Sequence, residues 1–208
     1  MSKDSYIHRV LPGSPGGPLL FTFHGTGGDE SQFLGLAREF LPAATIVTPR
    51  GDVSEHGAAR FFRRTGEGVY DMDDLARAAG KMSAFVHAHV EAAKPSSVVG
   101  LGYSNGANIL ASVVFANPAL FDAAVLMHPL IPFAPDVKGS LAGRRVLITA
   151  GRRDPICPPN LIARLEAHLR ARGADVTVEW HEGGHEIREN EIEAARLFLE
   201  EPKLTGVK

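Results

Sequence analysis

The stretch SVVGLGYSNGANILASVV, residues 97–114, decides how this 208-residue chain is expected to fold. It reads as a short apolar strand, then a Gly-x-Ser-x-Gly turn, then a helix rich in Ala, Ile, Leu and Val. Such a sharp turn strains the backbone of its serine, and residues without a β-carbon fit beside it. Gly102 and Gly106 meet that need on either side of Ser104. The pattern predicts a serine at the tip of a strand-to-helix turn, a nucleophile elbow.

The bare motif is weak evidence, and its flanks carry the prediction. A chain with 22 Gly contains this motif by chance roughly one time in eight. The apolar run 97–99 suits a buried parallel strand and follows directly after Pro95 and one serine. Beyond the turn, apolar residues recur at helical spacing until Asn117 and Pro118 end the element. Ser104 is therefore predicted to be a nucleophile rather than a serine in an ordinary loop.

The composition is that of an ordinary globular protein with one core. A chain of 208 residues is too short for two domains of usual size, so a single domain over residues 1–208 is expected. The 22 Lys and Arg face 24 Asp and Glu, without any long basic run. This balance argues against nucleic acid as a partner.

The sequence also bears on location. No apolar run approaches the roughly 20 residues that span a bilayer, and the N-terminus lacks the pattern of a secretory signal. We therefore expect a cytoplasmic protein with no membrane span. The single cysteine, Cys157, excludes an intrachain disulfide and a cysteine-based zinc site, in agreement with a reducing compartment.

Strands and helices alternate along the chain. Strands are expected at 6–11, 19–24, 45–49, 97–99, 123–127, 146–150 and 176–180. Helices are expected after Asp29, which resembles a capping box with Gln32, at 71–93, between the serine turn and Asn117, at 160–171 and around 192–199. This alternation implies the α/β class: a mainly parallel sheet with helices on both faces. In such sheets the site gathers at the carboxyl ends of the strands.

Those strand ends supply partners for the serine. A serine needs a base to take its proton and an acid to orient that base, and hydrolases of this type carry them in the order Ser, Asp or Glu, His. Asp154 follows a strand directly and is the predicted acid, whereas Asp136 lies in a Pro-rich connection.

His185 is the predicted base, because Gly183 and Gly184 can turn it back over the sheet. His128 precedes Asp154, which breaks the order, and His181 adjoins its strand as a candidate rim residue.

The glycine loop HGTGGDE at 24–30 admits two interpretations, a phosphate cradle or an oxyanion hole. It lacks the spacing of known phosphate loops, which leaves the oxyanion hole. The predicted backbone donors are the N–H groups of Thr26 and of Asn105, the residue after the serine. His24 is expected to brace the loop through a hydrogen bond.

These motifs together resemble the phospholipase/carboxylesterase branch of the α/β-hydrolases, which includes the acyl-protein thioesterases. The resemblance rests on HGTGGDE, PRG followed by RFFRR, GYSNGAN, the Asp154-Pro155 pair and GGH near the C-terminus. It implies a small α/β-hydrolase fold without a large cap domain, acting on small-molecule carboxylic esters with no metal or organic cofactor, and frequently dimeric. Acyl-protein thioesterases usually carry Gln where this chain has Asn105, so the chain is more similar to small bacterial carboxylesterases. Dienelactone hydrolases are similar in fold but carry Cys where this chain has Ser104.

The loop at 52–69 is long enough to suggest a binding role. The resemblance places its RFFRR segment near the acyl pocket. One or both of Phe61 and Phe62 are therefore expected to wall that pocket, while one of Arg60, Arg63 and Arg64 favours an anionic substrate; Arg63 is the arginine assigned to the pocket. A loop anchored by aromatics, with its arginines in surface pairs, is the alternative.

The sequence thus predicts a serine carboxylesterase that works through an acyl-enzyme intermediate. A thioesterase or lysophospholipase on the same three residues stays open. So do a binding protein of this fold with little turnover and a cofactor-free peroxidase or lyase, because fold and catalytic residues are shared by many chemistries.

Overall fold

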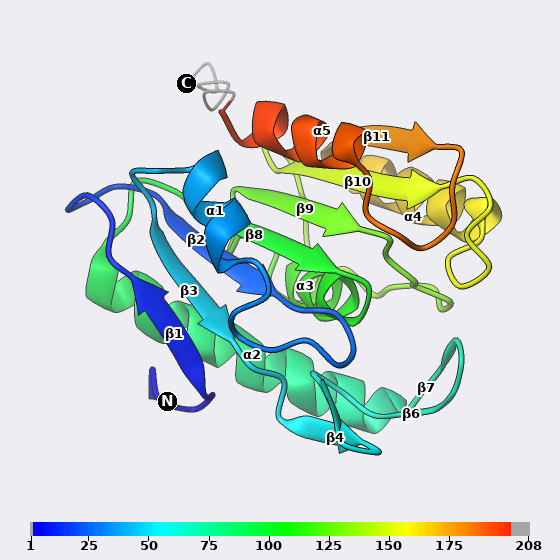
Figure 1. Cartoon of the computed structure of the whole chain (residues 1–208), viewed down its shortest axis with the longest axis horizontal. Helices are drawn as coiled ribbons and strands as arrows, with labels where there is room; N and C mark the ends of the chain where they lie inside the picture. Colours follow the sequence, from blue (N-terminus) through cyan, green and yellow to red (C-terminus); the bar gives the residue numbers. More distant parts are fainter. Residues whose placement is uncertain (1, 201–208) are drawn as a thin grey trace.

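Seven strands form one sheet through the middle of the molecule (Figure 1). The computed structural model describes residues 2–200. The strand order is β1-β3-β2-β8-β9-β10-β11; β1 pairs antiparallel with β3, and the other pairs are parallel. The strands are β1 (His8–Leu11), β2 (Leu19–Phe23), β3 (Thr45–Pro49), β8 (Val98–Tyr103), β9 (Ala123–Met127), β10 (Arg145–Gly151) and β11 (Asp175–His181).

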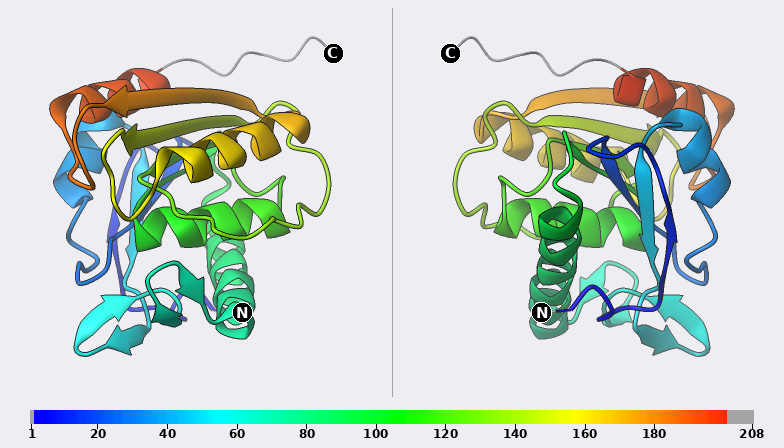
Figure 2. Two further views of the ribbon diagram at one scale, coloured as in Figure 1. Left: turned by 90° about the vertical axis from the view of Figure 1, so that its right-hand side faces the viewer. Right: turned by 90° about the vertical axis from the view of Figure 1, so that its left-hand side faces the viewer.

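In the described part of the chain, five helices cover the two faces of the sheet (Figure 2). One apolar core packs α2 (Met72–Ala93), α3 (Asn105–Ala116) and α4 (Pro159–Ala171) on one face. A second packs α1 (Leu34–Phe40) and α5 (Glu189–Glu200) on the other. The predicted α/β-hydrolase fold, mainly parallel with helices on both faces, is therefore confirmed. Within residues 2–200, none of the helices has both the length and the apolar character to cross a membrane.

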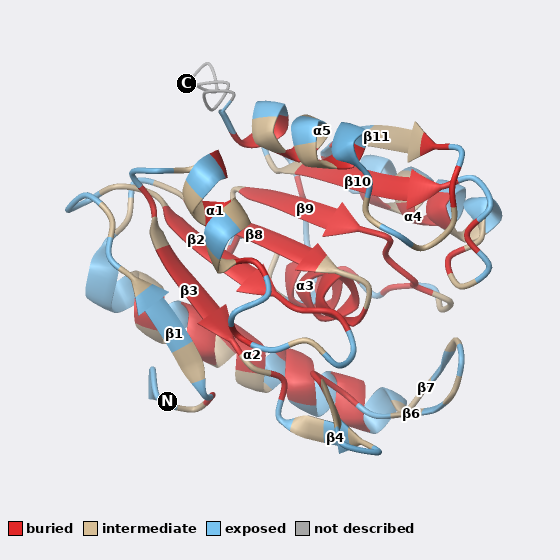
Figure 3. Cartoon of the chain, in the orientation of Figure 1, coloured by how far each residue is buried: buried red, intermediate tan, exposed pale blue. Residues whose placement is uncertain are grey.

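The apolar runs of the sequence form the central strands of the sheet, and these strands are buried (Figure 3). Every residue of β2 and β9 is buried, as expected for parallel strands covered on both faces. By contrast, β1 lies at the sheet edge and exposes the middle of the strand. The predicted edge strand is found there.

The start of α1 differs from the expected capping box. The helix begins at Leu34, and its N-cap residue Phe33 makes no side-chain cap. Asp29 instead accepts a hydrogen bond from the N–H of Ser31 (2.7 Å), and Gln32 accepts one from the N–H of Gly25 (2.9 Å). The capping-box prediction is wrong because both side chains are used to shape the preceding glycine loop.

The segment expected as a loop at 52–69 forms two small hairpins. One pairs β4 (Val53–Glu55) with β5 (Ala58–Arg60), and the other pairs β6 (Arg64–Gly66) with β7 (Val69–Tyr70). These strands are two or three residues long, too short to show an apolar alternation that a sequence pattern could reveal.

Candidate active site

Ser104 stands between β8 and α3 in the strained conformation that the motif predicts. Its backbone angles are φ 52° and ψ −117°, a region that non-glycine residues rarely occupy. A Cβ on Gly106 would lie 2.1 Å from the carbonyl oxygen of Phe23, and one on Gly102 would lie 2.4 Å from the carbonyl oxygen of Gly106. The two glycines therefore let β2, β8 and α3 meet behind the serine.

The structure brings the three predicted residues together from the ends of three strands. Ser104 follows β8, Asp154 follows β10, and His185 follows β11. Nε2 of His185 lies 2.9 Å from Oγ of Ser104, and Nδ1 of His185 lies 2.7 Å from Oδ2 of Asp154. The Asp154 carboxylate accepts from Nδ1–H of His185, and the tautomer with its proton on Nδ1 presents a lone pair at Nε2 to the serine hydroxyl. The arrangement can therefore take a proton from Ser104.

Asp154 is a buried residue whose side chain is an ionised carboxylate. Its side chain is fully buried, and Oδ1 accepts the N–H groups of Ile156 (2.8 Å) and Cys157 (3.0 Å). Burial alone would raise the pKa of Asp154, but the Cys157 N–H and the contacts with His128 and His185 hold it below its usual value. The carboxylate stays ionised and keeps a negative charge beside His185.

Tyr103 fixes the loop that carries His185. Its hydroxyl donates to the backbone carbonyl of His185 (2.7 Å), and the two rings lie 5.4 Å apart, centroid to centroid. Burial raises the pKa of Tyr103 to about 12, so this hydroxyl keeps its proton. Tyr103 is a site residue that the sequence analysis did not single out.

The predicted oxyanion donors lie around the same cavity. Thr26 and Asn105 both line it together with Ser104 and His185. Asn105 is the first residue of α3, so its N–H has no carbonyl partner within the helix. Its side-chain oxygen accepts the N–H of Phe61 (2.8 Å), which ties the elbow to the hairpin segment.

The glycine loop at 24–28 is held from two sides. His24 contacts the carbonyl of Gly25 through Nδ1 (2.7 Å) and accepts the N–H of Gly51 through Nε2 (2.8 Å). Burial lowers its pKa, in agreement with a neutral ring that accepts at Nε2. On the other side, the N–H of Gly27 donates to the carbonyl of Ala59 (3.0 Å). The expected bracing role of His24 matches these contacts.

The cavity at Ser104 has a volume of about 200 Å³ and a lining that is partly polar and partly apolar. Its aliphatic side chains are Leu130 and Ile156; the other lining residues are Thr26, Arg60, Arg64, Glu67, Tyr70, Tyr103, Ser104, Asn105, Asn108 and His185. A cavity of this size suits a small ligand.

The pocket residues expected from the RFFRR segment need correction. Phe61 and Phe62 have no exposed surface: Phe61 packs on Phe23 and His24, and Phe62 packs on Tyr70. Arg63 pairs with Asp71 and Asp74 at the start of α2. None of the three side chains lines the cavity at Ser104.

Arg60 and Arg64, the other two arginines of this segment, lie at the cavity instead. Both line the cavity, and both form ion pairs with Glu55 (3.4 and 3.0 Å). Arg64 also pairs with Glu67 (2.6 Å). The alternation of side chains around two short hairpins decided which arginine faces inward, and no sequence signal marks it.

Comparisons with known proteins agree with this fold. A profile of the dienelactone hydrolase family matches residues 58–193. MhqD of Bacillus subtilis (strain 168) is 38% identical over 185 residues, covering 88% of this chain and 92% of its own. The structure of the protein Atu2452 of Agrobacterium tumefaciens str. C58 is similar at 61% identity and TM-score 0.92, with 96% and 98% of the two chains covered.

A carboxylesterase is also among the similar structures. The Bacillus cereus carboxylesterase has 36% identity and TM-score 0.89, with 94% of this chain and 93% of its own covered. The resemblance to carboxylesterases of the α/β-hydrolase fold is thus confirmed. The dienelactone hydrolase profile matches this chain although the chain carries Ser104 at the elbow, where a Cys was expected for that family. The chain belongs to the dienelactone hydrolase family and is a hydrolase of the dienelactone hydrolase/carboxylesterase type.

Proposed function

We propose that this hydrolase is a serine carboxylesterase for small esters. The observation that carries the proposal is the contact chain from Oγ of Ser104 through the His185 ring to Oδ2 of Asp154, at 2.9 and 2.7 Å. In this mechanism Ser104 is the nucleophile, His185 the general base and Asp154 the group that orients the ring and stabilises its protonated form.

The reaction proceeds in two halves. Oγ of Ser104 attacks the ester carbonyl while its proton passes to Nε2 of His185, and the tetrahedral oxyanion is held by the N–H groups of Thr26 and Asn105. The proton then passes to the leaving alcohol, and the acyl group stays on Ser104. A water molecule, deprotonated by His185, attacks the acyl-enzyme; the carboxylic acid leaves and Ser104 regains its proton. The proposed steps require no metal or organic cofactor.

The cavity supports a short substrate. A volume of about 200 Å³ leaves little room for a long acyl chain. We therefore favour short-chain esters over the lysophospholipid and long-chain thioester alternatives. The homodimer and the cytoplasmic location stay predictions from the resemblance and the composition.

The test is a Ser104→Ala variant assayed with p-nitrophenyl acetate. Because the three residues act as a unit, kcat is expected to fall by about 10⁴-fold or more. Ser14→Ala, at an exposed serine outside the site, is the matched control and should keep wild-type kcat. A folded Ser104→Ala protein that retains turnover would refute the proposal.

Two further measurements separate the alternatives. A fluorophosphonate probe should label Ser104 covalently, whereas a binding protein without an activated serine should stay unlabelled. Across p-nitrophenyl acetate, butyrate and octanoate and the matching thioesters, kcat/KM is expected to fall with chain length. A maximum at octanoate would contradict the short-chain assignment.

A further inference from the structure

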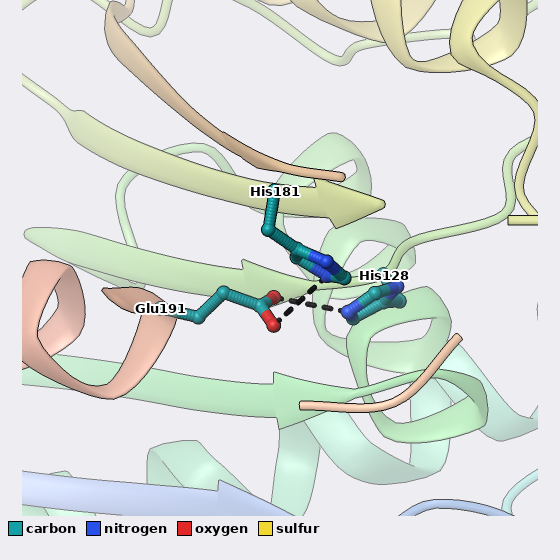
Figure 4. Close-up of side chains that lie close together, drawn as sticks. All are labelled: His128, His181 and Glu191. Carbon is teal, nitrogen blue, oxygen red and sulfur yellow. Dashed lines mark ion pairs between the residues drawn. The ribbon is translucent and has the colours of Figure 1, made fainter. Parts of the chain in front are cut away.

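A buried network of ionisable side chains lies behind the proposed catalytic residues. His128 follows β9, His181 ends β11, and Glu191 lies in the first turn of α5. Figure 4 shows these three side chains pointing toward one another from separate elements. The side chains of His128 and Glu191 have no exposed surface, and that of His181 is 4% exposed. The network reaches the active site through Asp154, which contacts His128.

Both ring nitrogens of His128 face carboxylate oxygens. Nδ1 lies 2.8 Å from Oδ2 of Asp154, and Nε2 lies 2.9 Å from Oε1 of Glu191. A neutral imidazole has a single N–H, so one of these contacts would set two lone pairs against each other. The imidazolium form makes both contacts attractive: a hydrogen-bonded ion pair with Asp154, and with Glu191 an ion pair whose angle lies outside hydrogen-bond geometry. Burial opposes the charge on His128, but the ion pairs with Glu191 and Asp154 outweigh it and raise its pKa.

Glu191 is held as a carboxylate by four groups. Oε1 accepts the hydroxyl of Thr149 (2.5 Å) and faces His128, while Oε2 accepts the N–H of Arg188 (2.7 Å) and faces Nε2 of His181 (3.1 Å). Burial would raise the pKa of Glu191, but its partners, His128 first among them, lower it. Glu191 therefore brings a second buried negative charge near the site.

The proton position on His181 argues against a metal centre. The nitrogen and oxygen atoms of His128, His181 and Glu191 that could bind a metal ion lie within 4.8 Å of one another, a spacing that a metal site would have. Nδ1 of His181, however, accepts the N–H of Gly183 (2.9 Å), so its proton must sit on Nε2, facing Glu191. A histidine that binds a metal donates through its other nitrogen. His181 does the reverse, so the three residues form an ion-pair network.

Two histidines share one oxygen of Asp154. Oδ2 lies 2.8 Å from Nδ1 of His128 and 2.7 Å from Nδ1 of His185. Two carboxylates and one imidazolium leave one net negative charge facing His185, the same as a lone aspartate would present. His128 thus fixes the position of the oxygen on which His185 depends without changing that charge.

The other titratable groups around His128 are two histidines, a tyrosine and a cysteine. Its ring lies 5.1 Å from that of His185, 5.4 Å from that of His181 and 5.9 Å from that of Tyr103. The thiol of Cys157 donates to the carbonyl of His128 (3.2 Å). Burial raises the pKa values of Tyr103 and Cys157, which keeps both neutral.

We propose that His128 and Glu191 are positioning residues of the hydrolytic site: Glu191 holds His128 as an imidazolium, and His128 holds the Asp154 oxygen that faces His185. The kinetic part of this proposal rests on the proposed esterase mechanism. The protonation part does not, and the two are measured separately.

The protonation state is read by NMR on wild-type protein labelled with ¹⁵N-histidine, between pH 6 and 9. One histidine, assigned to position 128 through its backbone, should show two protonated ring nitrogens throughout this range. A nitrogen of His128 without a proton at pH 7 would overturn the proposal. This readout does not depend on activity, so it stands whether or not Ser104 is the nucleophile.

The kinetic role is tested with Glu191→Gln, which keeps the shape of the side chain and removes its charge. His128 should then lose a proton between pH 6 and 9, kcat should fall on the order of tenfold with KM unchanged, and the kcat profile should gain an ionisation at the same pH. Glu193→Gln is the matched control, since Glu193 is exposed on the same helix and pairs with Arg196.

Wild-type kcat and an unchanged pH profile in Glu191→Gln would overturn the positioning role. Should that variant fail to fold, Thr149→Val removes one donor to Glu191 while keeping its charge. It should lower kcat by roughly two- to fivefold with the same change in profile, and unchanged values would count equally against the proposal.

Discussion

Arg60 donates a hydrogen bond of 2.7 Å to the hydroxyl of Thr26, from a side chain that is only 3% exposed. The guanidinium also donates to the carbonyl of Phe62 (3.3 Å) and pairs with Glu55 (3.4 Å). A buried arginine of the hairpin thus anchors the loop that carries a proposed oxyanion donor. Arg60 belongs to the site through Thr26, not through a free charge offered to the substrate.

Replacing Arg60 by Met should therefore loosen the oxyanion loop while keeping the buried volume. We expect kcat to fall on the order of tenfold, since removing a whole oxyanion donor costs about 100-fold or more and this change only misplaces one. Arg63→Met is the control, because Arg63 is 60% exposed and pairs away from the cavity. Steady-state kinetics on p-nitrophenyl acetate decide, and wild-type kcat in Arg60→Met would contradict the anchoring role.

Arg64 provides the test for anionic substrates. It lines the cavity, so Arg64→Gln should lower kcat/KM for mono-p-nitrophenyl succinate about fivefold more than for p-nitrophenyl acetate. The estimate is of the order of 1 kcal/mol, because the pairs with Glu55 and Glu67 and the solvent screen the charge. Arg63→Gln should leave the ratio unchanged. An equal decrease of kcat/KM for both esters in Arg64→Gln would contradict a role of Arg64 in selecting anionic substrates.

Gly106 should tolerate no side chain. In Gly106→Ala the new Cβ would meet the backbone of Phe23 at 2.1 Å, so strands must move apart. We expect the free energy of unfolding to fall by about 3 kcal/mol or more. Gly80→Ala, in the exposed part of α2 with no atom within 4 Å, should instead gain up to about 1 kcal/mol. Urea unfolding followed by circular dichroism measures both, and a neutral Gly106→Ala would show that the elbow can relax.

His89 should make stability depend on pH on the acid side. Burial, then the neighbouring charge of His8, lower its pKa from 6.5 to about 4. Between these values the unfolded chain binds the proton and the folded protein does not, so stability falls as the pH drops through this window. The slope from this group is at most about 1.4 kcal/mol per pH unit. Urea unfolding at pH 7, 6 and 5 should show a flatter dependence in His89→Gln than in the wild type; parallel curves would contradict this assignment.

Sequence alone determined the features that depend on local structure. Apolar runs bounded by Gly and Pro marked the strands because parallel strands are buried on both faces, and the carboxyl-end rule then selected Asp154 and His185. The glycines around Ser104 marked the elbow because only a missing Cβ allows the backbone contacts found there. These features follow from local sequence patterns, so they can be predicted without knowing the tertiary contacts.

Tertiary structure decided which side chains meet across elements. Phe61, Phe62 and Arg63 were expected in the pocket, but hairpin geometry buried the two aromatics and turned Arg63 toward α2. His128 was set aside on chain order and Glu191 carried no motif, yet β9 and α5 bring them together beside Asp154. Their charge state depends on burial and on partners 26 to 63 residues away in the chain; only the folded protein sets both, because the effective dielectric and the neighbouring charges arise from packing.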